Sequence, residues 1–295
     1  MEEIRKSQNK FAGMSYNISS EKFTHPLLKP ILQELTEYFR KAEISFFVIG
    51  ATARDIFMEL HKEKSGRLTY DLDLAITVNN WEQWLKVEQE ILKLKNFTKD
   101  KDQKQRFLYK DKFQVDIVPF GEIMKQDSKI FWPPDENLAM SVLGFNAAEE
   151  ASLKVSVDQE VEIRIASLSG IFLLKIVAWN DRHQKSNKDA DDMGFILENY
   201  LGIHEERAAV NYYDEIYTDD FTTVKGGATL LGKDVFEILL EHPRELEAIR
   251  NILTANLEKK EESKLINQII ETHKSLYYEE VLQSIQNVVD GLNQK

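Results

Sequence analysis

The chain reads Phe46-Phe47-Val48-Ile49-Gly50-Ala51-Thr52-Ala53-Arg54-Asp55, an apolar run that ends in glycine, and further on Tyr70-Asp71-Leu72-Asp73-Leu74-Ala75-Ile76. The first segment predicts a buried strand, a tight turn and then a helix. If the second segment is a strand, residues two apart point to the same face, so the carboxylates of Asp71 and Asp73 lie side by side. Two adjacent carboxylates repel each other unless a cation joins them.

If a cation joins Asp71 and Asp73 and is bound by oxygen atoms alone, we expect a third carboxylate nearby. Mg2+ is usually bound by one or two carboxylates together with substrate phosphates. The segment 112–120 supplies Asp116 within a β-branched, apolar run that predicts another buried strand. Burying unpaired carboxylates costs several kcal/mol by order of magnitude, so such placement favours function over chance. These features together indicate a phosphoryl-transfer site with two metal ions.

The glycine turn itself has two interpretations. Gly50 would let the backbone approach a triphosphate, the helix after it would offer N–H groups, and Thr52 would add a hydroxyl donor. Alternatively, Gly50 is only a strand-to-helix turn and Thr52 an N-cap. Arg54 and Asp55 are either an internal ion pair or residues that orient the site. The turn alone does not decide between these interpretations.

Composition narrows the class of protein. The chain has 295 residues, enough for two domains, and 42% hydrophobic residues, as in ordinary globular proteins. It has no cysteine, which excludes disulfides, thiolate metal sites and Cys nucleophiles. With no run of about 18 apolar residues and no signal-like N-terminus, we expect a cytoplasmic protein without a membrane partner. A net charge of -12 disfavours a broad nucleic-acid-binding surface, but it is compatible with a local basic groove.

Periodicity divides the chain into two parts. Helices are expected at 26–41, 51–60 and 81–94, and short strands at 46–49, 106–109, 113–118, 144–147, 153–157 and 161–165. Strands this closely spaced form hairpins, so the sheet should be mixed. From residue 167 on, helical spacing prevails at 168–181, 189–199, 203–213, 233–240, 243–254 and twice within 261–292, with a flexible loop at 225–227. The prediction is an α+β fold: a mixed-sheet domain flanked by helices at 1–166, followed by an α-helical domain at 167–295.

These residues carry a family resemblance. The run 50–55, the pair Asp71 and Asp73 and the isolated Asp116 are similar to the signature of the DNA polymerase beta-like nucleotidyltransferase superfamily. The resemblance implies NTP and two Mg2+ ions, with transfer of a nucleoside monophosphate and release of pyrophosphate. By that resemblance all three aspartates bind metal, and Asp116 also assists the attacking hydroxyl. Ala51 departs from the pattern, because many members have a second glycine or a serine there.

Within that superfamily the chain most resembles the AbiEii-like predicted nucleotidyltransferases. That resemblance rests on Lys175, Trp179 and Arg182, and on the run Lys188-Asp189-Ala190-Asp191-Asp192. The first three are spaced to share one helix face. It implies phosphate contacts from Lys175, Arg182 and Lys188, and Lys175 would neutralise the leaving pyrophosphate. An ordinary alternative is that the two cations pair with Asp189 or Asp192 between neighbouring helices.

The expected function is therefore a Mg2+-dependent nucleotidyltransferase that binds an NTP, ATP among them, through Gly50, Ala51, Thr52 and Arg54. The acceptor stays open among an RNA end, a protein and a small molecule. Two alternatives remain: a non-catalytic nucleotide-binding module, and a toxin–antitoxin interaction protein with a cognate antitoxin as partner. A more distant alternative is a tRNA 3'-end nucleotidyltransferase, whose Gly-Gly-x-x-Arg-Asp turn the run 50–55 resembles.

Overall fold

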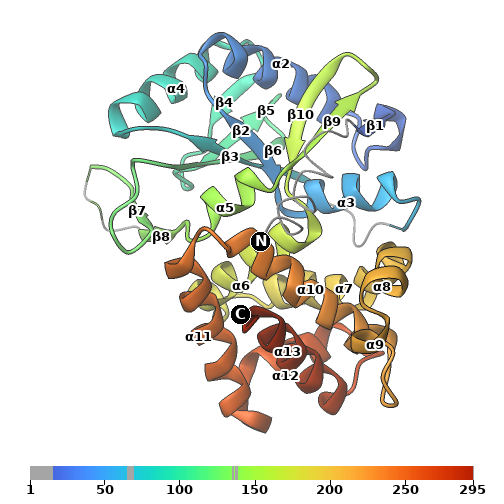
Figure 1. The fold of residues 1–295 in the computed structure, drawn as a ribbon. Helices are drawn as coiled ribbons and strands as arrows, with labels where there is room; N and C mark the ends of the chain where they lie inside the picture. Colours follow the sequence, from blue (N-terminus) through green and yellow to red (C-terminus); the bar gives the residue numbers. More distant parts are fainter. Residues whose placement is uncertain (1–15, 65–69, 135, 137–138, 295) are drawn as a thin grey trace. The chain divides into compact units, whose positions relative to one another are not determined.

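The computed structural model describes residues 16–64, 70–134, 136 and 139–294 (Figure 1). Its contacts divide the chain into two compact units, Met1–Ser167 and Leu168–Lys295. The first unit holds a large mixed sheet with helices, and the second is helical where it is described. The predicted fold class, a mixed sheet flanked by helices and followed by a helical region, is confirmed.

Most elements of the first unit match the predicted segments to within a few residues. In chain order they are β1 (Tyr16–Ile18), η1 (Ser20–Lys22), α2 (Leu28–Lys41), β2 (Phe46–Ile49), α3 (Gly50–Leu60), β3 (Asp71–Thr77), α4 (Trp81–Lys93), β4 (Phe97–Lys99), β5 (Arg106–Tyr109), β6 (Phe113–Phe120), β7 (Lys129–Phe131), β8 (Ala139–Ser141), α5 (Phe145–Glu150), β9 (Leu153–Val157) and β10 (Val161–Ile165).

The main sheet has eight strands in the order β1-β9-β10-β2-β3-β6-β5-β4. β3 runs parallel to β6 and antiparallel to β2, while β5 runs antiparallel to β6. Figure 1 shows α2 and α4 on one side of this sheet and α3 and α5 on the other. The sheet is therefore covered on both faces, which explains why residues 74–76 of β3 and 117–120 of β6 form continuous apolar runs.

The helices pack through the apolar stripes that their sequences predict. In α2 the buried side chains recur at helical spacing, at Leu28, Ile31, Leu32, Leu35 and Phe39. Asn80 caps the N-terminus of α4, because its side chain accepts a hydrogen bond from the Gln83 N–H. Within the sheet, α2 contacts β10 and α4 contacts β4.

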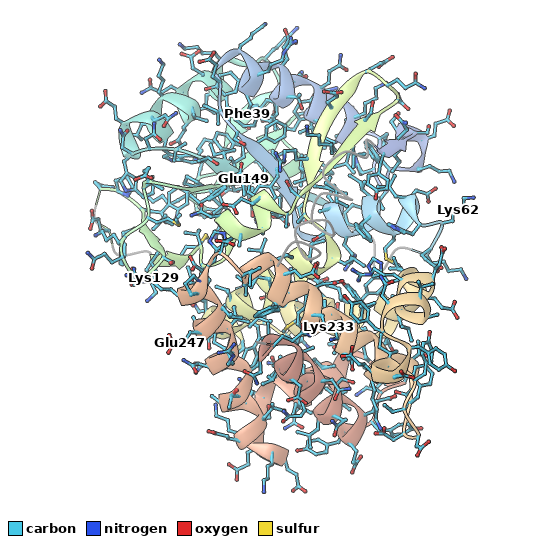
Figure 2. All side chains as sticks on the ribbon, viewed as in Figure 1. Phe39, Lys62, Lys129, Glu149, Lys233 and Glu247 are labelled. Carbon is cyan, nitrogen blue, oxygen red and sulfur yellow. The ribbon has the colours of Figure 1, made fainter. Side chains whose placement is uncertain are left out.

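The strand predicted at 144–147 is wrong, because this segment begins the helix α5. Gly144 has a φ of 78°, a left-handed conformation that breaks the extended chain just before the helix. Phe145, Ala147 and Ala148 are buried on one side of α5. Glu149, labelled in Figure 2, accepts hydrogen bonds from Ser45 and Thr77 and so attaches α5 to the sheet. A segment of four residues is too short to distinguish a strand from one helical turn.

The second unit, where it is described, consists of helices. They are α6 (Leu168–Arg182), α7 (Lys188–Ile203), α8 (Glu205–Asn211), α9 (Tyr213–Ile216), α10 (Thr223–Leu239), α11 (Pro243–Glu258), η2 (Lys260–Glu262), α12 (Lys264–Thr272) and α13 (Tyr278–Leu292). Across the described residues of both units, none of the helices combines the length and apolarity that a membrane crossing needs.

The flexible loop predicted at 225–227 is also wrong, because these residues lie inside α10. A Cβ atom added to Gly226 would meet the Phe221 ring at 2.8 Å, and one added to Gly227 would meet the Leu201 backbone nitrogen at 3.0 Å. Both glycines are therefore needed for close packing, at Gly227 against the last turns of α7. Sequence alone does not distinguish a packing glycine from a loop glycine.

Candidate active site

Strand register assembles the candidate site across the middle of the sheet. Ile49 pairs with Asp73, Asp73 pairs with Asp116, and Asp116 pairs with Arg106, so one row of residues crosses β2, β3, β6 and β5. Directly paired residues point to the same face. Two of the three predicted metal ligands are thus neighbours, although 43 positions separate them along the chain.

Asp71 completes the trio of carboxylates on the same face. It lies two residues before Asp73 on β3, so both side chains point the same way, and each is partly exposed. Leu72 and Leu74 alternate with them and are fully buried on the opposite face. The predicted placement of Asp71, Asp73 and Asp116 on adjoining strands therefore agrees with the fold.

Gly50 lies directly against the Asp73 carboxylate. A Cβ atom at residue 50 would come within 2.3 Å of Asp73 Oδ2, and the φ of Gly50 is +67°. Both the space and the backbone conformation therefore require glycine. The helix α3 begins here, and because Ile49 has no polar side-chain atom it provides no cap for the first N–H groups. The turn thus places a helix N-terminus beside the carboxylates.

The residues that follow Gly50 are mostly buried inside the first unit. Ala51 and Thr52 lie in the first turn of α3, and the Thr52 hydroxyl donates a hydrogen bond to the Asp71 carbonyl over 3.1 Å. A hydroxyl has one hydrogen, so a phosphate contact by Thr52 would have to come through its backbone N–H. Arg54 is 2% exposed, and its guanidinium donates to Asp55 Oδ1 at 2.9 Å. This pairing agrees with the internal ion-pair interpretation of Arg54 and Asp55.

Arg106 is a residue of this site that the sequence interpretation missed. Its Nε donates to Asp116 Oδ1 at 2.7 Å and its terminal nitrogen donates to Asp116 Oδ2 at 2.8 Å, a two-pronged ion pair. The hydrogen bonds to Asp116 raise the pKa of Arg106 above its ordinary value. The predicted hairpin contained the necessary signal, because pairing Tyr109 with Phe113 sets Arg106 opposite Asp116.

The donor set fits a hard divalent cation, but the carboxylates are not gathered around one point. Among the described residues, no group of three His, Cys, Asp or Glu side chains is arranged to hold a metal ion. Both oxygens of Asp116 face Arg106. Oxygen-only ligands are those that Mg2+ prefers, and Asp71 and Asp73 lie beside the start of α3, where phosphates bind well. The chemistry therefore suits metal and phosphate.

Two of the three predicted basic residues of the second unit, Lys175 and Arg182, form an ion-pair cluster between α6 and α7. Lys175 Nζ contacts Asp192 Oδ2 at 2.6 Å and Asp189 Oδ1 at 3.2 Å. Arg182 donates to both oxygens of Asp189 at 2.7 Å. Burial by itself would raise the pKa of Asp189, but Arg182 and Lys175 hold it below its ordinary value.

This cluster agrees with the ordinary alternative for the two cations. Trp179 lies between them on α6 and is 2% exposed, with its ring N–H donating to Gln268. Lys188 is exposed at the first turn of α7. Contacts of Lys175, Arg182 and Lys188 with a triphosphate stay predictions.

Comparison with known protein families gives a match over most of the chain. The sequence model of the family described as "Nucleotidyl transferase AbiEii toxin, Type IV TA system" matches residues 35–283. No curated protein matches the sequence significantly.

Two solved structures show a weak similarity. One is an antigenic nucleotidyltransferase-like protein from Paracoccidioides brasiliensis, with 14% identity and a TM-score of 0.41, over 79% of this chain and 94% of that one. The other is the Elizabethkingia meningoseptica CdnE cyclic dinucleotide synthase with GTP and Apcpp, with 10% identity and a TM-score of 0.29, over 98% of each chain. The family match is the stronger finding, because both TM-scores are low.

Proposed function

Because the chain belongs to the AbiEii family of nucleotidyl transferase toxins of type IV toxin–antitoxin systems, we propose that it transfers a nucleoside monophosphate from an NTP to a hydroxyl acceptor. The acceptor oxygen would attack the α-phosphorus, and the bond from that phosphorus to the α–β bridging oxygen would break. Pyrophosphate leaves with the bonding electrons, and the hydroxyl proton goes to a carboxylate. The family description also makes a cognate antitoxin an expected counterpart.

The observation that carries this proposal is the row of carboxylates beside the glycine turn. Asp73 and Asp116 are paired in register, Asp71 shares their face, and Gly50 lies against Asp73. These three aspartates would hold two Mg2+ ions, which supply charge neutralisation for the transferred phosphoryl group and the leaving pyrophosphate. An acidic row of this kind has no evident use in a fold that binds neither cations nor phosphates.

The chain's own groups would divide the remaining work. The first N–H groups of α3, from Gly50 and Ala51, would bind the triphosphate, helped by the positive end of the helix dipole. Thr52 ties this turn to β3 through the Asp71 carbonyl, so the phosphate-binding turn and the carboxylates keep a fixed spacing. Asp116 would accept the proton of the attacking hydroxyl.

Calorimetric titration with each NTP, with and without Mg2+, tests the binding step. We compare wild type with the double variant D71N/D73N, which keeps side-chain size but removes two charges. As a control, D102N changes an exposed aspartate in the loop between β4 and β5. We expect Mg2+-dependent NTP binding by wild type and D102N, and its loss in the double variant. NTP binding that does not depend on Mg2+, or that persists in the double variant, would refute the proposed site.

Transfer itself is tested with α-labelled NTP offered to total RNA, to protein and to small hydroxyl compounds. Loss of both aspartates should lower the transfer rate by on the order of a thousandfold, since metal stabilisation of the transition state amounts to several kcal/mol and each 1.36 kcal/mol is tenfold. Far-ultraviolet circular dichroism of the double variant checks that the loss does not come from misfolding. Mg2+-dependent NTP binding with no transfer to any acceptor class would favour the non-catalytic alternative.

A further inference from the structure

The Arg106–Asp116 pair conflicts with the role expected of Asp116. A carboxylate that binds a metal must turn oxygen lone pairs toward the ion. Here each oxygen of Asp116 accepts a hydrogen bond from Arg106, at 2.7 and 2.8 Å. The two side chains are 23% and 13% exposed, so water screens this pair only partly.

The pair also reduces the charge repulsion among the three aspartates when no cation is bound. Asp71, Asp73 and Asp116 share one face of adjoining strands, and carboxylates placed so closely repel each other. Arg106 contributes one positive charge at the edge of this row. Strand pairing places Arg106 directly opposite Asp116, on the side of β6 away from β3. Arg106 thus neutralises part of the repulsion within the folded chain.

We propose that Arg106 is a built-in counter-ion, which holds Asp116 in the absence of a divalent cation and competes with that cation for it. The inference rests on the proposed function, since it takes the aspartate row as the metal site. Arg106 is a positioning residue, because it acts through Asp116. A metal ion must then either displace the guanidinium from Asp116 or share the Asp116 carboxylate with it. Arg106 therefore raises the cation concentration that is needed to fill the site.

Thermal unfolding followed across a MgCl2 titration, at constant ionic strength kept with NaCl, tests this competition without any activity. The variant R106Q removes the charge and one prong of the fork. Without Mg2+ we expect R106Q to unfold at a lower temperature than wild type, because the row loses its counter-ion. Mg2+ should then raise its unfolding temperature more than it raises that of wild type. The half-effect concentration should fall by at least about tenfold, the order expected when one like charge near a divalent cation is removed even at the dielectric constant of water, about 80.

Two further variants make the test specific. R106K keeps the charge, but its ammonium group cannot bind both oxygens of Asp116 in the same bidentate geometry. The half-effect concentration should therefore fall by a smaller factor than in R106Q, about two- to threefold. R106K also decides the question if R106Q does not fold. R164Q is the matched control: Arg164 is a partly buried arginine of the same sheet that bonds Ser152 and the Glu149 carbonyl, away from the aspartate row. The R164Q substitution should lower the unfolding temperature by the same amount with and without Mg2+.

The outcomes separate this inference from the proposed function. A half-effect concentration that is unchanged or higher in R106Q or R106K, while wild type responds to Mg2+ and D73N does not, overturns the role of Arg106 alone. If neither wild type nor any Arg106 variant responds to Mg2+, the counter-ion role and the metal site fail together. Repeating the titration with MnCl2 should give the same order of variants, because the competition depends on charge.

Discussion

At Gly50 a single missing side chain decides whether the site can exist. The residue combines a left-handed backbone with a carboxylate placed where a Cβ atom would otherwise lie, 2.3 Å from Asp73 Oδ2. Any other residue would have to move Asp73 or the start of α3. Either movement separates the aspartate row from the first turn of the helix.

We expect G50A to be destabilised by about 1–3 kcal/mol, the usual cost of a strained left-handed residue, and to lose Mg2+-dependent NTP binding. Denaturant unfolding and calorimetry measure the two effects. The control is G202A, because Gly202 lies in α7 with nothing within 4 Å of the added Cβ. It should keep its stability or gain about 0.5–1 kcal/mol from the better helix former. A G50A protein with wild-type stability and NTP affinity would contradict the steric argument.

At the scale of single residues, the sequence predicts well which side chains share a face of a strand, but it predicts poorly which partners they bind. The period of two along a strand was enough to set Asp71 and Asp73 on one face. Arg106 was missed because its importance lies in register, a relation between two segments. The Thr52 hydroxyl is a similar case, since no pattern in the sequence tells that it donates to the Asp71 carbonyl.

At the scale of the elements, the pairing of α6 with α7 depends on Asp189, which is 1% exposed and bonded by two cations. Its pKa is lowered in the folded protein. A lowered pKa stabilises the fold fully above the unfolded value, near 3.9, and this contribution is lost as the pH falls through the folded value. The interface between these helices should therefore weaken in acid.

We expect D189N to lose about 1.5–3 kcal/mol at neutral pH, the range for hydrogen bonds to charged groups. Its stability should also fall less steeply than that of wild type as the pH drops below about 4, because Asn does not titrate. Urea unfolding from pH 6 down to pH 3 measures both effects. D102N, with its exposed side chain, is the control and should follow the wild-type curve. Parallel curves for wild type and D189N would show that Asp189 does not carry this pH dependence.

Element prediction was dependable where the pattern was long, and one of its errors lies in a short segment. The helices α2 and α4 carry apolar stripes over three or more turns, and both were predicted within a few residues. The four-residue segment 144–147 could be one helical turn or a short strand, and Gly144 decides for the helix. In α10 the glycines at 226 and 227 were misread because the neighbour that needs them, Leu201, lies on another helix.

On the scale of the whole molecule, net charge constrains the acceptor. A chain with a charge of -12 repels a polyanion at long range, because non-specific nucleic-acid binding depends on clustered Lys and Arg. We expect no measurable binding to a long homopolymer RNA at physiological salt in a mobility-shift assay. A basic RNA-binding protein serves as positive control. Tight binding that weakens steeply with salt would instead reveal a local basic groove and favour an RNA end as acceptor.

The pairing of Asp73 with Asp116 has a consequence for the cell that makes this protein. A slip of one residue between β3 and β6 would turn the two carboxylates to opposite faces, and a chain without β6 would have no third carboxylate at all. In the proposed site, catalytic competence therefore requires correct pairing of segments made at different moments of synthesis. Under that proposal a nascent, truncated or mispaired chain would lack the site, and only the finished fold would transfer nucleotides.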